Sequence, residues 1–152
     1  MIDGRRFTPI LIGVAAVILI HQVADLATLL PGTDFATPAG RVRQLLAVEA
    51  RSPGVLTADL LLIWALLRGG YRRGLRLTRT LHFGLGVLLL ALVPWFLLDA
   101  GQVAGAFAGT ESRAFRIVVS RTLLMLSLLG VGALLAGRAL HGYLAEAKTP
   151  EQ

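Results

Sequence analysis

Four long apolar runs, separated by shorter polar stretches, set the pattern of this chain. We place them at about residues 7–30, 54–69, 79–100 and 115–140. A helix rises 1.5 Å per residue, so about 20 apolar residues cross the roughly 30 Å hydrocarbon layer of a membrane. The second run is the shortest and needs its flanks to reach both interfaces. The pattern predicts one all-α domain over residues 1–152, an integral membrane bundle of four transmembrane helices.

The segment between the first two runs is amphipathic. Thr37 suits an N-cap and Pro38 a first helical turn, so we expect a short helix over about residues 38–51. One face of this helix is apolar and carries Val42, Leu45 and Leu46. We expect it to lie on the outer membrane surface and to end at Ser52–Gly54. Its apolar face then serves either as a lid over the bundle or as a docking surface for a partner or a lipid.

Basic residues predict the orientation. Arginine supplies all but one of the 15 basic residues, and the net charge is +6. The segment between the second and third runs holds the densest group, Arg68, Arg72, Arg73, Arg76 and Arg79. Because positively charged segments stay in the cytoplasm, we expect both termini there and this group against anionic lipid headgroups. Arginines that flank apolar runs do not indicate nucleic acid as a partner.

Usage of arginine over lysine, together with abundant Ala, Gly and Leu, is typical of GC-rich bacterial genomes. The expected location is therefore the inner (plasma) membrane of a bacterium, with several crossings.

Ionisable residues inside the runs are the main candidates for a site. A charge at the bilayer centre costs about 2.5–3.5 kcal/mol. Counted from the helix ends, Asp25, Asp59 and Arg121 each lie roughly 7–9 Å from the outer side. His21 lies one turn deeper than Asp25 on the same face. We predict that Arg121 bridges the two carboxylates and that His21 bonds to this cluster, which either locks the helix order or handles protons or ions.

Small residues recur at helical spacing after the third run. Gly101, Gly105 and Gly109 form a ridge that a neighbouring helix can approach closely, and Gly130 and Gly132 form a weaker patch. The ridge predicts close packing, either within the chain or against a second subunit.

His82 and His141 mark the cytoplasmic ends of the third and fourth runs. Facing each other, they could ligate a haem, a chlorin or a metal, but no second pair completes such a site. We therefore expect no cofactor and no metal. The chain has no cysteine, which excludes disulfides and thiolate chemistry.

No catalytic motif is present, and we expect a protein that is not an enzyme, with a membrane-embedded enzyme as an alternative. Two function classes remain. The first is a non-catalytic accessory or structural subunit of a larger membrane complex, such as a respiratory, photosynthetic or transport assembly. The alternative is a small homo-oligomeric ion or solute transporter or channel that uses the intramembrane His/Asp/Arg site.

Overall fold

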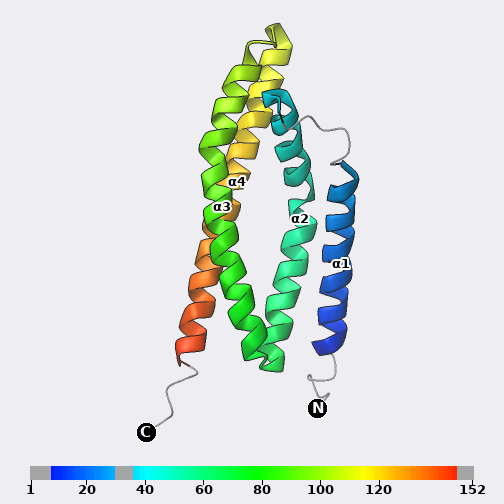
Figure 1. Ribbon diagram of the computed structural model, residues 1–152, viewed down its shortest axis with the longest axis vertical. Coiled ribbons are helices and arrows are strands. Elements are labelled where there is room, and N and C mark those ends of the chain that lie inside the picture. The colour runs from blue at the N-terminus through cyan, green and yellow to red at the C-terminus, as the bar shows by residue number, and fades with distance from the viewer. Residues whose placement is uncertain (1–7, 30–35, 147–152) are drawn as a thin grey trace.

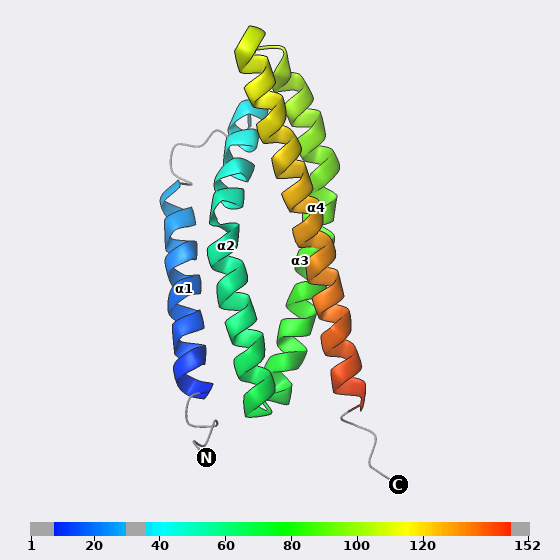
Figure 2. The same cartoon turned by 180° about the vertical axis from the view of Figure 1, so that it is seen from behind.

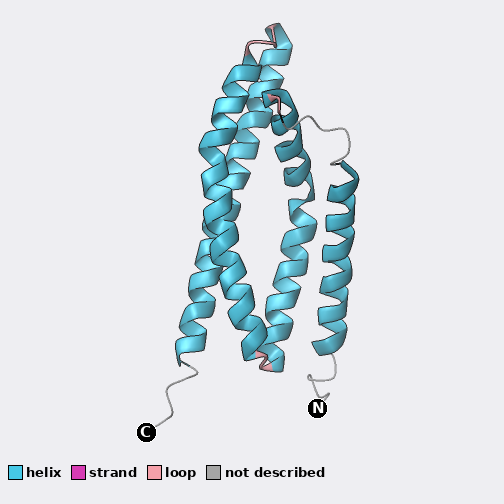
Figure 3. Cartoon of the chain, in the orientation of Figure 1, coloured by secondary structure: helices cyan, strands magenta, loops and turns pink. Residues whose placement is uncertain are grey.

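The computed structural model describes residues 8–29 and 36–146, which form four helices and no strand (Figures 1 and 3). The helices are α1 (Thr8–Leu29), α2 (Pro38–Gly69), α3 (Arg72–Ala104) and α4 (Gly109–Glu146). The all-α prediction is confirmed. Three segments are long and apolar enough to cross a membrane: Ser52–Gly69, Arg72–Ala104 and Glu111–Glu146. The apolar stretch of α1, Thr8–Gln22, is shorter.

Successive helices run in opposite directions, so α1 begins at the same end of the bundle at which α4 ends (Figures 1 and 2). We call this the arginine-rich end, because the turn from α2 to α3 lies there with its arginines. Within the described ranges, α1 packs against α2 only, α2 lies between α1 and α3 and packs against both, and α3 and α4 form the most extensive pair. At the opposite end the α3–α4 hairpin extends beyond α1 and α2 (Figure 2).

The expected surface helix is not a separate element. Thr37 caps it as predicted, since its side chain accepts a hydrogen bond from Gly40 N–H at 3.2 Å. The helix then continues through Pro53 to Gly69, instead of ending at Ser52–Gly54. A proline removes one backbone hydrogen bond, and this loss is tolerated where neighbouring helices hold the segment. The expected lid is thus the first half of α2, standing along α3.

The turn between α2 and α3 depends on one glycine. Gly70 has φ 68°, in the left-handed region that favours glycine. The amide of Tyr71 donates to the Leu66 carbonyl at 3.1 Å, which satisfies a carbonyl at the end of α2. The chain re-enters a helix at Arg72, so α2 and α3 form a tight antiparallel hairpin.

Two apolar clusters join α2 to the α3–α4 pair, one near each end of the bundle. Val42, Phe96 and Leu126 form the core of the first, and Leu45 and Leu46 pack against it. The second cluster lies toward the arginine-rich end and is built on Leu66, Leu75, Leu140 and Leu144. The apolar face that we predicted for residues 38–51 is therefore used inside the bundle.

Glycines bring the backbones of α3 and α4 together. A Cβ built on Gly86 would lie 2.9 Å from the carbonyl oxygen of Gly130 and 2.7 Å from Leu134 Cγ. One built on Gly130 would lie 2.8 Å from Leu90 Cγ. Without a hydrophobic drive between helices in lipid, such close backbone contact is a main source of association.

The predicted ridge of Gly101, Gly105 and Gly109 does not lie on one helix. α3 ends at Ala104, and Gly109 begins α4 with φ 56°. Between them the chain turns, and the rings of Phe107 and Phe115 stack with their centroids 4.6 Å apart.

We predict that Gly130→Val lowers the stability of the bundle by about 1–3 kcal/mol, because its side chain must displace Leu90 and separate the two backbones. Gly132→Val is the matched control, since a Cβ there meets no atom within 4 Å. Unfolding in detergent micelles measures both. Equal losses for the two variants would show that α3 and α4 do not cross at Gly130.

Candidate functional site

An aspartate and a histidine pair inside the bundle, between α2 and α3. Oδ2 of Asp59 lies 2.9 Å from Nε2 of His82. The other ring nitrogen of His82, Nδ1, lies 2.8 Å from the carbonyl oxygen of Thr78, one turn earlier in α3. The side chain of His82 is 9% exposed and that of Asp59 is 29% exposed. Both residues lie in segments that are apolar enough to cross a membrane.

The contacts of His82 fix how many protons the pair holds. A carbonyl oxygen only accepts, so Nδ1 carries a hydrogen and donates it to Thr78. Nε2 then either donates to the Asp59 carboxylate as part of an imidazolium, or accepts a hydrogen from the protonated carboxyl. In both cases one proton lies between Nε2 and Oδ2, and the pair has no net charge. This arrangement avoids an isolated charge in hydrocarbon.

A second polar pair joins the same two helices near the opposite end. Arg41 donates from Nε to Oδ2 and from Nη2 to Oδ1 of Asp99, each at 2.7 Å. The side chain of Asp99 is 3% exposed and that of Arg41 is 28% exposed. A two-bond pair of this kind fixes the orientation of both side chains, and charged donors make such bonds strong.

Sequence reasoning missed both pairs, although a signal for one of them was present. Asp59 and His82 lie nearly the same number of residues before and after Gly70, so an antiparallel hairpin sets them opposite each other. Arg41 was placed on a surface helix, where it has no reason to meet Asp99.

We predicted that Arg121 bonds to Asp59, but the structure does not bring these two residues together. Gly86 of α3 lies beside Gly130 of α4, and from this register Arg121 lies roughly 20 Å from the level of His82 along the bundle axis. His21 is exposed on α1, and the side chain of Asp25 lies outside the described residues.

His82 and His141 do not share a partner. His82 bonds to Asp59 on α2, whereas His141 Nδ1 lies 3.1 Å from Nη1 of Arg79. A pair of facing axial ligands, the less favoured alternative in our sequence analysis, is thus not formed by these rings. Among the described side chains, no group of three or more His, Cys, Asp or Glu residues is placed to hold a metal ion.

The predicted headgroup-binding arginines gather at the arginine-rich end. Arg68 lies over the ring of Trp64, with its guanidinium carbon 5.5 Å from the ring centroid. The first turns of α3 carry the remainder of the group, Arg72, Arg73, Arg76 and Arg79.

The predicted packing glycines divide into two groups. Gly130 lies in the contact between α3 and α4, where Gly86 is its unpredicted counterpart. Gly101, Gly105, Gly109 and Gly132 face open space within the described part of the chain, since a Cβ on any of them meets no described neighbour within 4 Å.

Comparison with known proteins adds no family. No protein-family model, curated protein or solved structure matches the chain.

We predict that Arg41→Met destabilises the bundle by about 3 kcal/mol, because it leaves the Asp99 carboxylate buried without its counter-ion. Arg43→Met, which removes the same charge from an exposed neighbour, is the control. In the double variant Arg41→Met/Asp99→Leu most of the loss should be recovered, since no charge remains. Unfolding by SDS titration gives all four stabilities. A double variant that is no more stable than Arg41→Met would contradict this account.

For the Asp59–His82 pair, we expect Asp59→Leu to cost about 1–3 kcal/mol, because Nε2 of His82 loses its partner. Asp59→Asn should stay within about 1 kcal/mol of the parent, since the amide can donate to the Nε2 lone pair. SDS titration compares the two, and the ¹⁵N chemical shifts of His82 report its tautomer. Identical stabilities for the Leu and Asn variants would count against the hydrogen bond.

Proposed function

We propose that this protein is a non-catalytic subunit of a larger membrane complex, such as a respiratory, photosynthetic or transport assembly. The support is a set of glycines against which no described residue of the chain packs closely. Gly101 on α3, Gly105 directly after it and Gly132 on α4 are open to close approach, since a Cβ on each meets nothing within 4 Å among the described residues. Gly86 and Gly130 show how the same residue type is used where this bundle packs against itself.

The α3–α4 hairpin offers additional surface. With 33 and 38 residues, α3 and α4 are about 50 and 57 Å long, against a hydrocarbon layer of roughly 30 Å. The hairpin extends beyond α1 and α2 at the end opposite the arginines (Figure 1). Gly101 lies in the last turn of α3 and Gly105 directly follows that helix.

The membrane placement belongs to the same proposal. We propose that α1 crosses as a fourth span, because it runs antiparallel along α2, which contains a candidate span. The arginine-rich end then faces the cytoplasm of a bacterial inner membrane, with both termini on that side. Apolar side chains suited to lipid contact lie on several helices: Ile20 and Leu60 are each 67% exposed, and Leu98 is 69% exposed.

The test is the composition of the complex after mild detergent extraction from native membranes. We expect unrelated membrane chains to co-purify in fixed proportion with the parent protein. Gly101→Leu/Gly105→Leu should release them, because the added side chains block close approach at positions where a Cβ meets nothing within 4 Å among the described residues. Gly84→Leu, an equally open position on α3, should keep them bound.

One observation favours the alternative, a small homo-oligomeric transporter or channel. The Asp59–His82 pair holds a proton between two groups, and its carboxylate is partly exposed. A pure homo-oligomer that moves protons across liposome membranes, and loses this flux in Asp59→Asn, would replace the subunit proposal with this one.

A further inference from the structure

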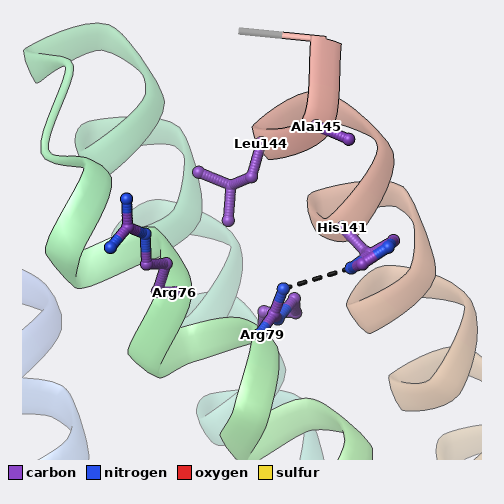
Figure 4. A pocket seen from close by; sticks show the side chains of 5 residues that line it. All are labelled: Arg76, Arg79, His141, Leu144 and Ala145. Carbon is purple, nitrogen blue, oxygen red and sulfur yellow. Dashed lines mark hydrogen bonds between the residues drawn. The ribbon is translucent and has the colours of Figure 1, made fainter. Parts of the chain in front are cut away.

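A cationic cleft opens between α3 and α4 at the arginine-rich end. Its volume is about 920 Å³, and its lining includes Arg79, Phe83, Leu134, Arg138, His141 and Gly142. A smaller hollow beside it shares Arg79 and His141 and adds Arg76 and Leu144. Figure 4 shows Arg79 reaching from α3 to His141 on α4, with Arg76 and Leu144 around the smaller hollow.

The contact between Arg79 and His141 decides which way the imidazole donates. A guanidinium has only donors, so Nδ1 of His141 accepts from Nη1 of Arg79 at 3.1 Å. A neutral ring then carries its hydrogen on Nε2. Arg79 and His141 both line the cleft, and the Arg79 guanidinium has further N–H donors besides the one that it gives to His141.

No carboxylate lines either hollow among the described residues. The two carboxylate ion pairs of the described chain engage Arg41 and His82, which lie elsewhere. Arg79 and Arg138 therefore bring two positive charges to the cleft that no acidic side chain of its lining offsets. An anion is the complementary ligand, and a guanidinium is well suited to phosphate.

The rest of the lining is apolar. Phe83, Leu134 and Leu135 line the same cleft and lie in segments apolar enough to cross a membrane. Gly142 leaves its part of the wall open, since a Cβ there meets no atom within 4 Å. A ligand with a charged head and a long apolar tail matches both parts, whereas a free phosphate matches only the first.

We propose that this cleft binds one anionic phospholipid, with its phosphate at Arg79 and Arg138 and an acyl chain along Phe83 and Leu134. Basic pockets between transmembrane helices are an established way to hold such headgroups. The site rests on the membrane location of α3 and α4 and not on the proposed role as a subunit. The sequence predicted contacts between lipid headgroups and arginines in general. The proposed site is more specific: it consists of Arg79, Arg138 and His141 beside an apolar wall.

Lipid binding to the full chain in detergent tests the site. Native mass spectrometry with added phosphatidylglycerol should show one tightly bound lipid. Phosphatidylcholine with the same chains should bind at least about fivefold more weakly, because its headgroup carries no net charge. Inorganic phosphate should not compete at concentrations equal to those of the lipid. Competition by phosphate at that level would overturn the choice of a lipid.

Two variants separate a built site from diffuse attraction. Arg138→Gln should weaken phosphatidylglycerol binding about fivefold, as expected for one basic residue near a membrane surface. Arg113→Gln is the matched control, because it removes the same charge from an exposed position on α4 that lies outside both hollows and outside the headgroup-binding arginines. Equal losses in the two variants would overturn the proposal.

Gly142→Leu tests the shape of the cleft with charge held constant. A Cβ at Gly142 meets nothing within 4 Å among the described residues, so we expect the bundle to form normally while the leucine side chain fills part of the cleft. We expect at least a fivefold loss of binding, comparable to that of Arg138→Gln. Unchanged binding in Gly142→Leu would place the lipid elsewhere. If the parent protein binds the lipid but no partner chain co-purifies with it, only the proposed subunit role is contradicted.

Discussion

The pairing of polar groups between α2 and α3 is the contact on which the rest of the bundle depends. In hydrocarbon no water replaces a missing partner, so an ionisable side chain must find one within the protein. Arg41 meets Asp99 at one level and Asp59 meets His82 at another. Two contacts at different levels fix both the height and the rotation of α2. Because α1 packs only against α2 among the described helices, the position of α1 follows from the same contacts.

The α3–α4 pair is held by a different device. Gly86 and Gly130 allow the backbones to meet, and Leu90 and Leu134 close around them. Neither ion pair of the described residues lies at this crossing. Close packing of this kind is not selective for charge, so it suits a permanent hairpin. The ion pairs instead fix the rotation of α2 relative to α3. The two apolar clusters alone would permit α2 to rotate about its own axis.

Hydrophobic patterning predicted the helices, because it records which residues avoid water. Thr37 and Pro38 also gave the correct start of α2, since capping is a local property. The predicted cluster around Arg121 failed to include Asp59 because depth was counted from a helix end assumed at Gly54. With α2 continuing through Pro53, that end does not exist, and Asp59 belongs to the level of His82. The sequence also could not show which glycines face inward. Their spacing shows that they share one face of a helix, but not whether that face points toward the bundle.

The Asp59–His82 pair has the same geometry whether it serves structure or proton transfer. One proton lies between the two groups in either protonation pattern, so neutrality in the membrane is preserved while the proton moves from one atom to the other. The difference lies in access. His82 is nearly enclosed and its second nitrogen is bound to Thr78, whereas Asp59 is more exposed. Exchange with the surroundings would therefore pass through the carboxyl of Asp59, and a partner that covers this side chain would convert a proton-holding pair into a purely structural one.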